Sequence, residues 1–235
     1  MVCRLKNLVF IRKDFMRFFH PLSILVIASA LLLSGVAGCA SCCHDNPSIA
    51  CRDKVKTVTT SGITATYTYD TTGRLVLIAR SDGSSTSYTY ATGSVTETNT
   101  PAGGAASSIV FALNADGLAI SDSRGTTYQY DSNGYTIKTV YSSFTDSRTI
   151  VNGNIVVETR DGSSPVTYNV SYTPLRDCQD YGLSFLGKQS RNLRQTQFAT
   201  DGTPPINYIY EFANGKLVTR TATGGASLVS TFTYY

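Results

Sequence analysis

The sequence predicts an all-β protein, an antiparallel meander of about a dozen strands curved into a barrel-like or half-barrel sheet. Two observations predict this fold class. Aromatic and small polar residues alternate along most of the chain, as in Tyr67-Thr68-Tyr69, and this period of two is that of a strand with one buried face. Asp-Gly and Asn-Gly pairs stand between the alternating runs, and such pairs favour the tight turns of hairpins.

The composition is typical of strands joined by turns. The 235 residues include 15 Tyr, 10 Phe and no Trp, and only 15 % are charged. Aromatic residues are enriched in strands. A chain of this length forms one domain with a full core, or at most two small ones.

Residues 1–38 are predicted to be a lipoprotein signal peptide, and Met16 is the expected natural start. Basic residues precede an apolar run at 22–33, which is too short for a comfortable membrane span and has the length of a signal-peptide core. The letters VAGC that end at Cys39 resemble a bacterial lipobox. We therefore expect diacylglycerol on the Cys39 thiol. The alternative is an ordinary secretory peptide cut near Ala40 or Ser41.

Residues 39–52 are small and polar without periodicity, and we interpret them as a lipidated tether before a β-meander domain at 53–235. The residue after the lipid site is Ala40, not the Asp that retains some lipoproteins at the inner membrane. We therefore expect the outer membrane. The leaflet stays open between periplasm and cell surface, because only Asp45 resembles an acidic surface-export signal.

The charge distribution argues against a nucleic-acid partner. The formal charge of +4 arises up to Cys39, where five basic residues stand against one acid, Asp14. The remaining 15 basic and 15 acidic residues balance. The mature chain is therefore neutral and gives no reason to expect nucleic acid or anionic lipid as a partner.

The cysteines allow a disulfide. An exported chain meets an oxidising compartment, and Cys42, Cys43, Cys51 and Cys178 follow the lipid site. A bridge between adjacent cysteines strains the peptide, so we favour Cys51–Cys178; free thiols near the anchor are the alternative. No metal site is predicted, because there is no Cys-x-x-Cys ladder and His44 is the only histidine after the leader.

The aromatic rows form one face of the predicted sheet. Beyond the first run they recur at Tyr88/Tyr90, Phe111/Leu113, Tyr128/Tyr130, Tyr168/Val170/Tyr172, Tyr208/Tyr210/Phe212 and Phe232/Tyr234. On an exposed face such rows can stack a sugar or a peptide. We favour a core role, because the opposite face is Thr and Ser, which water can cover. The candidate binding residues are Tyr67, Tyr69, Tyr88, Tyr90, Tyr128, Tyr130, Tyr208 and Tyr210.

The turns and one insertion complete the chain. In Asp70-Thr71-Thr72-Gly73 the spacing predicts a type I turn followed by a left-handed glycine. Residues 174–205 are predicted to be a longer loop insertion, because the alternation weakens there and 181–187 looks helical or looped. A long insertion can hold a function. We prefer to interpret it as a cap over one open end of the sheet.

Two resemblances follow from these motifs. Residues 67–90 resemble a YD repeat of the Rhs type. We interpret this likeness as a shared hairpin sequence pattern, because the later units of the chain depart from the repeat. The lipobox, the Tyr-x-Tyr hairpins, Asn152-Gly153-Asn154 and the stretch LGKQSRNL at 186–193 resemble a family of uncharacterised lipoproteins of Gram-negative gut bacteria, a domain of unknown function with a porin-like fold. This resemblance implies a curved, barrel-like antiparallel sheet and no particular activity.

No catalytic residue and no cofactor are predicted. His44 falls in the tether, which excludes a Ser-His-Asp or Cys-His arrangement in the domain. Most Asp residues occupy turns. Glu97, Glu158 and Glu211 fall in predicted strands, where two of them could face each other as a glycosidase pair or could simply pair with basic residues.

The sequence therefore indicates an outer-membrane lipoprotein that is a non-catalytic binding or accessory protein of the cell envelope. Its expected partners are the membrane, through the lipid anchor, and a glycan, a peptide or an envelope protein. A membrane-spanning β-barrel pore is the first alternative, because the terminal run at 230–235 resembles the last strand of outer-membrane barrels. A carboxylate-dependent hydrolase is the second.

Overall fold

The computed structural model describes residues 53–224 and 227–235; the predicted signal peptide, the tether, Cys39 and Cys51 lie outside the described residues. The described chain is almost entirely β-structure, with one short 3-10 helix. No helix in it is long and apolar enough to cross a membrane. The elements are β1 (Asp53–Thr60), β2 (Ile63–Tyr69), β3 (Leu75–Arg80), β4 (Ser85–Ala91), β5 (Ser94–Thr100), β6 (Ser107–Leu113), β7 (Ala119–Asp122), β8 (Thr127–Tyr130), β9 (Thr136–Val140), β10 (Thr145–Val151), β11 (Asn154–Asp161), β12 (Val166–Arg176), β13 (Gln179–Asp180), η1 (Ser184–Leu186), β14 (Asn192–Ala199), β15 (Ile206–Ala213), β16 (Lys216–Thr223) and β17 (Leu228–Tyr234).

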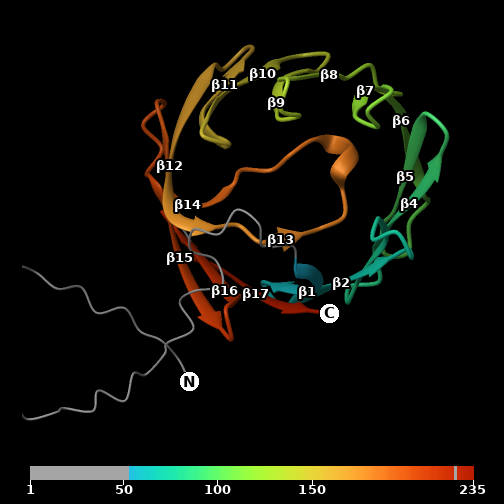
Figure 1. The fold of residues 1–235 in the computed structure, drawn as a ribbon, viewed down its shortest axis with the longest axis horizontal. Helices are drawn as coiled ribbons and strands as arrows, with labels where there is room; N and C mark the ends of the chain where they lie inside the picture. Colours follow the sequence, from blue (N-terminus) through green and yellow to red (C-terminus); the bar gives the residue numbers. More distant parts are fainter. Residues whose placement is uncertain (1–52, 225–226) are drawn as a thin grey trace, which may run out of the picture.

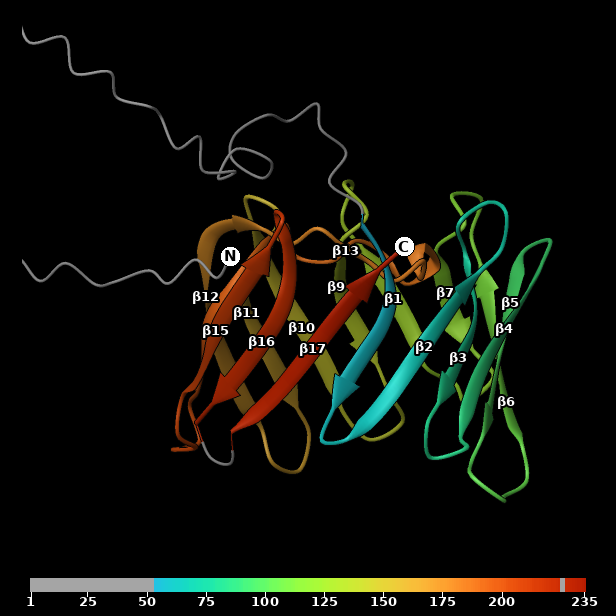
Figure 2. The ribbon, with the colours of Figure 1, turned by 90° about the horizontal axis from the view of Figure 1, so that it is seen from below.

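Sixteen of the 17 strands in the described part of the chain form one closed barrel. Each wall strand pairs antiparallel with the next along the chain, except that β12 pairs with β14 and leaves the short β13 out of the wall. The last strand returns to the first, where Val58 of β1 stands opposite Phe232 of β17. Figure 1 shows the resulting ring end-on, and Figure 2 shows the tilted strands of its wall from the side. The predicted antiparallel meander curved into a barrel is confirmed.

The strand count is higher than about a dozen because the shortest strands without an aromatic pair escape a search for alternation. β7 has 4 residues and β9 has 5, and neither contains Tyr or Phe. In so short a run one turn residue at either end removes the period of two. The structure therefore adds strands without changing the predicted fold class.

The hairpin turns follow the predicted chemistry. The N–H of Gly73 donates to the carbonyl of Asp70 at 2.9 Å, and Gly73 has a φ of +81°. The Asp70 carboxylate accepts the N–H groups of Thr72 and Arg74, both at 2.9 Å. An aspartate that opens the turn and a left-handed glycine that closes it thus reverse the chain between β2 and β3.

Alternation places the aromatic rows inside the barrel and threonines outside. Along β15 the burial alternates, so that Tyr208 and Tyr210 are half-buried while Ile209 between them is exposed. At the closing seam the hydroxyls of Thr57 and Thr233 lie 2.7 Å apart on the exposed outer face. The buried apolar side chains form two clusters: Leu75, Ile78, Tyr88, Val95, Phe111, Ala119 and Phe185, and Leu193, Leu217 and Phe232.

Between β12 and β14 the chain leaves the wall and crosses the barrel interior (Figure 1). We call residues 177–191 the lumen segment; it contains β13 and η1. The predicted insertion at 174–205 is too long, because Asn192–Ala199 is wall strand β14. The alternation of β14 is hard to recognise because Arg194 and Gln197, not aromatic residues, occupy lumen-side positions opposite β12.

Four parts of the barrel rim hold the lumen segment in place. β13 runs parallel to the start of β1, and Figure 2 shows β13 and η1 near the end of the barrel at which β1 begins. This position agrees with the predicted cap over one end of the sheet. The four contacts are the Lys54–Asp180 ion pair at 2.8 Å and the N–H groups of Leu75, Lys188 and Arg191, which donate to the carbonyls of Gly182 at 3.2 Å, Gly134 at 2.8 Å and Gly153 at 2.8 Å.

Phe185 of η1 anchors the lumen segment in the larger apolar cluster. Its side chain is only 3 % exposed. The Phe185 ring centroid lies 5.2 Å from that of Phe111 and 6.3 Å from those of Tyr88 and Tyr90. The segment therefore packs on the part of the wall from β3 to β7 and does not fill the space beside the opposite half of the barrel.

Cys178, at the start of the lumen segment, is disulfide-bonded. Its carbonyl accepts the N–H of Asp53 at 2.9 Å, which joins the segment to the first residue of β1. The predicted partner, Cys51, lies outside the described residues, so the Cys51–Cys178 pairing stays a prediction.

Candidate functional site

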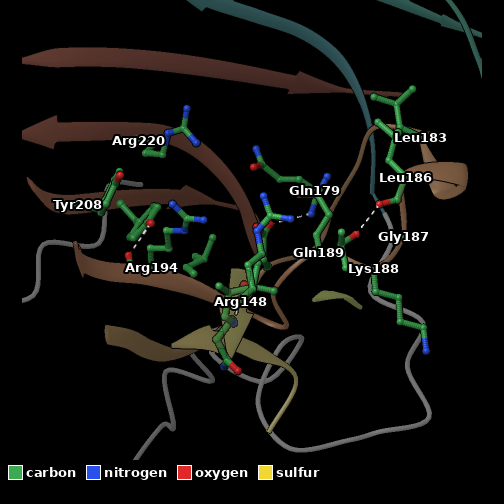
Figure 3. A pocket seen from close by; sticks show the side chains of 17 residues that line it. Arg148, Gln179, Leu183, Leu186, Gly187, Lys188, Gln189, Arg194, Tyr208 and Arg220 are labelled. Carbon is green, nitrogen blue, oxygen red and sulfur yellow. Dashed lines mark hydrogen bonds between the residues drawn. The ribbon is translucent and has the colours of Figure 1, made fainter. Parts of the chain in front are cut away.

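A cavity of about 430 Å³ lies beside the lumen segment inside the barrel. The lumen segment forms one side, and residues of β9, β10, β11, β14, β15 and β16 form the other (Figure 3). Small-molecule sites in proteins have volumes of this order, roughly 300–1,000 Å³. We call this space the lumen cavity.

Three arginines from three separate strands line the lumen cavity: Arg148 of β10, Arg194 of β14 and Arg220 of β16. Figure 3 shows Arg194 and Arg220 reaching from the wall into the space that Gln179 and Gln189 border on the other side. The wall positions these two because each stands opposite an inward-facing tyrosine of the neighbouring strand. The barrel thus concentrates basic groups on one side of its interior.

Two of these guanidinium groups have few partners. Arg194 donates one hydrogen bond, from Nη1 to Oε1 of Gln197 at 3.1 Å. Arg220 lies over the ring of Phe232, 5.7 Å from its centroid. Within residues 53–224 and 227–235, no carboxylate lies within ion-pair distance of either group. Because a guanidinium carries five N–H donors, most donors of this pair are unused.

Asp177 is the acidic group of the lumen cavity. Burial raises the pKa of its carboxyl, while the N–H of Gln179 and the charges of Arg220 and Arg194 pull that pKa in the other direction. The Gln179 N–H donates to Oδ1 of Asp177 at 3.2 Å. One carboxyl therefore stands against two guanidinium groups, and the cavity keeps an excess of positive charge.

Two aromatic rings and apolar side chains complete the lining. Tyr208 and Tyr210 of β15 are stacked, with ring centroids 6.5 Å apart and an interplanar angle of 15°. The hydroxyl of Tyr210 donates to the carbonyl of Arg194 at 2.6 Å, which fixes the ring beside the arginine. Leu183 and Leu186 lie on the side of the lumen segment. The cavity therefore combines the positive charge of Arg194 and Arg220 with the flat apolar rings of Tyr208 and Tyr210.

The barrel separates the predicted binding tyrosines into two groups. Tyr208 and Tyr210 line the lumen cavity. The other six face the lumen as well but contact the lumen segment or the core instead: Tyr67, Tyr69, Tyr88, Tyr90 and Tyr128 belong to the cluster around Phe185, and Tyr130 lies against Gly187.

The three strand carboxylates do not come together as a pair. Glu97 accepts a hydrogen bond from Asn99 at 2.7 Å on β5. Glu158 of β11 accepts Nη2 of Arg148 at 3.0 Å, and Glu211 of β15 is exposed. Among the described residues no group of three His, Cys, Asp or Glu side chains gathers in a way that could hold a metal ion.

Sequence patterns did not point to Arg194 and Arg220, although a signal for Arg220 exists. On β16 the threonines Thr219, Thr221 and Thr223 mark the outward phase, and Arg220 stands between them. A charged residue opposite the threonine phase of a barrel strand must face the interior. The predicted tyrosines form a recurring pattern that can be recognised in the sequence. The two arginines are single residues on different strands and form no such pattern.

The architecture is that of porin-like barrels. A porin-like protein from Bacteroides uniformis has a TM-score of 0.61 to this chain at 14 % sequence identity, covering 78 % of this chain and 99 % of that one. A porin-like protein from Bacteroides vulgatus gives a TM-score of 0.53, also at 14 % identity and with 78 % and 99 % covered. The sequence matches no family model, and no curated protein matches it significantly. The chain thus has a porin-like β-barrel fold, as the resemblance to the lipoprotein family implies.

Proposed function

We propose that the protein is an outer-membrane lipoprotein, held by diacylglycerol on Cys39, whose barrel binds a solute in its lumen without catalysing a reaction. The observation that carries this proposal is the lumen cavity of about 430 Å³, which lies between a firmly attached lumen segment and the barrel wall. The cavity has the volume of a small-molecule site, and its lining joins charged and amide side chains to the rings of Tyr208 and Tyr210. The lipobox-like VAGC before the tether supports the anchor.

The outer face of the wall supports a barrel that stands in water. A barrel in a bilayer has an outward apolar band of about 25 Å and strands of about 9–11 residues. Here β12 has 11 residues, and no other described strand exceeds 8. Outward threonines face each other in the pairs Thr57–Thr66, Thr59–Thr64, Thr89–Thr96 and Thr219–Thr231. Exposed large apolar residues of the described wall are spread over many strands: Ile63, Val110, Ile120, Val151, Phe198, Ile209, Leu228 and Val229.

A pore is the second candidate function, and one observation favours it. The closed barrel places ion pairs such as Arg148–Glu158 and Arg160–Asp146 on its inner side, and charged side chains inside a barrel are typical of water-filled channels. Against a pore stands the lumen segment, which is bonded to the rim on several sides. Planar-bilayer conductance of the full chain separates the two functions: we expect no ion current, and steady single-channel steps would support the pore.

The anchor is tested by replacing its thiol. In a Gram-negative host, wild-type protein should fractionate with membranes and require detergent for release, whereas the Cys39→Ala variant should not carry lipid. Metabolic labelling with a fatty acid should mark the wild type alone. Membrane attachment of Cys39→Ala equal to that of the wild type would contradict the lipid anchor.

Solute binding is tested by filling the lumen cavity. Gln189 lines it from the lumen segment, whereas the exposed Ser184 of the same segment does not. The full chain, purified in detergent, is dialysed against a small-molecule extract of the cell envelope, and retained molecules are identified by mass spectrometry. We expect the wild type and Ser184→Trp to retain the same solute and Gln189→Trp to lose it. No retained solute, or equal retention by all three proteins, would contradict the proposed function.

A further inference from the structure

We propose that the lumen cavity selects solutes that carry an oxyanion, a carboxylate, phosphate or sulfate group, and that Arg194 and Arg220 hold that group. This inference rests on the proposed function, because it assumes that the cavity binds a solute. It adds the chemical class of the ligand and the residues that recognise it.

The unused donors carry the argument. Among residues 53–224 and 227–235, Arg194 donates one N–H to Gln197, and Arg220 makes a ring contact with Phe232 and no hydrogen bond. Both are half-buried, and within the described chain neither has a carboxylate in ion-pair distance. A guanidinium is planar and matches an oxyanion with two parallel hydrogen bonds, so two such groups at one cavity form a site for that shape.

The other arginine and the nearby lysine do not compete for this role. Arg148 already donates from Nε and Nη2 to Oε1 of Glu158, at 3.1 and 3.0 Å, so its charge is matched. Lys188 lines the cavity, but its ammonium lies over the ring of Tyr135, 5.8 Å from the centroid, and Figure 3 shows it pointing away from the arginines. The anion site is therefore local to Arg194 and Arg220.

Asp177 reduces the positive charge of this site but does not occupy the donors of the two arginines. Burial raises the pKa of its carboxyl, and the charges of the two guanidinium groups act to lower that pKa. The three groups therefore interact electrostatically. No ion pair forms between them in the described chain. A second oxyanion brought by a ligand can therefore take the donors that Asp177 leaves unused.

The rest of the cavity indicates the body of the ligand. The stacked rings of Tyr208 and Tyr210 stand beside Arg194, and Leu183 and Leu186 of the lumen segment belong to the lining of the same cavity. Flat apolar faces of this kind stack on sugar or other rings. The cavity therefore suits an anionic ring compound, such as a uronic acid, better than a bare ion.

Calorimetry with three probes tests the selectivity. The full chain, purified in an uncharged detergent without sugar groups, is titrated with glucuronate, with glucose as its neutral counterpart, and with inorganic phosphate. We expect glucuronate to bind best, phosphate more weakly and glucose not measurably. Arg194→Gln and Arg220→Gln should each weaken glucuronate binding by about tenfold or more, because a hydrogen bond to a charged group is lost.

Arg80→Gln is the matched control. Arg80 faces the lumen from β3, opposite Ala65, but is not part of the cavity lining. Its variant should bind glucuronate as the wild type does. The inference would be overturned if neither anion bound, or if the Arg194→Gln and Arg220→Gln variants bound glucuronate as tightly as the wild type. Binding of glucose as tight as that of glucuronate would also overturn it, yet would leave solute binding in the lumen standing.

Discussion

Two glycines decide how closely the lumen segment approaches the wall. Gly182 and Gly187 have φ values of +68° and +89°. A Cβ on Gly182 would lie 2.7 Å from the backbone nitrogen of Leu75, and one on Gly187 would lie 2.7 Å from a ring carbon of Tyr130. Both the backbone conformation and the missing side chain are therefore needed at these positions.

Gly187→Ala should destabilise the protein more than a turn glycine does. Gly117 has a similar φ of +77°, and a Cβ added there would meet nothing within 4 Å, so Gly117→Ala isolates the cost of left-handed backbone, about 1–2 kcal/mol. Gly187 combines its φ of +89° with a ψ of −178°, which glycine alone readily adopts. Gly187→Ala therefore adds both this backbone strain and the clash, and it should cost roughly 2–4 kcal/mol. Equilibrium unfolding in urea measures both variants. Equal losses would show that the segment can move away from Tyr130.

The half-buried carboxyl of Asp177 should make stability depend on pH. Burial raises its pKa above the usual 3.8, so the unfolded state ionises first as the pH rises. The folded state therefore loses stability relative to the unfolded state from about pH 3.8 up through the raised pKa. Asp177→Asn removes this loss and should be more stabilising at pH 7 than at pH 3. Asp116→Asn, at an exposed turn, is the control, and an equal pH response of both variants would contradict the assignment.

At the scale of elements, the lumen segment depends on one aromatic side chain as well as on its rim contacts. Phe185 fills the apolar cluster between β3 and β7, while the rest of the segment is polar enough to border the cavity. This division gives the segment a fixed side and a ligand-facing side. Its attachment therefore decides whether the lumen cavity exists at all.

Phe185→Ala should loosen the lumen segment. Removing a buried phenylalanine typically costs about 3–5 kcal/mol, and amide hydrogen exchange should rise in residues 177–191 before the wall strands respond. Phe198→Ala is the matched control, because that ring is 47 % exposed on the outer face of β14. It should cost less than about 1 kcal/mol. Unchanged exchange in the segment of Phe185→Ala would mean that the rim hydrogen bonds suffice.

At the scale of the whole molecule, the barrel depends on a seam between its first and last strands. β1 and β17 pair over Thr57 to Thr60, and the hydroxyls of Thr57 and Thr233 are in contact. A cysteine pair at these two positions should form a disulfide on oxidation, seen as a mass loss of about two hydrogens and resistance to alkylation. Thr89→Cys with Thr233→Cys is the control, because β4 and β17 are separated around the wall. An open sheet would leave both pairs unlinked.

The sequence predicts the wall better than the contents of the lumen. Tyr67 and Tyr69 alternate with threonine, and Asp70 and Gly73 close a turn, so local chemistry defines strand, face and hairpin. The lumen segment is predicted as an insertion and as a cap, but not with its boundaries. Its contacts join residues far apart in the chain, such as Lys54 with Asp180, and no local pattern records them.

The arginines of the cavity show the same limit. Arg194 and Arg220 line the same cavity because β14 and β16 stand on either side of β15 in a curved wall. Sequence alternation gives the face on which each side chain lies but not the curvature that makes those faces converge. The three-dimensional structure is therefore needed to recognise that these two separate basic residues belong to one candidate site.

The seam between β1 and β17 also has a consequence for the order of assembly. Val58 and Phe232 stand opposite each other yet come from the two ends of the domain, so no closed ring exists before the last strand has been delivered. Until then both terminal strands expose unpaired backbone edges, which recruit other chains. Contacts so distant in sequence also form slowly. A newly made chain should therefore pass through an open, self-associating sheet, and a chaperone that shields strand edges should raise its folding yield.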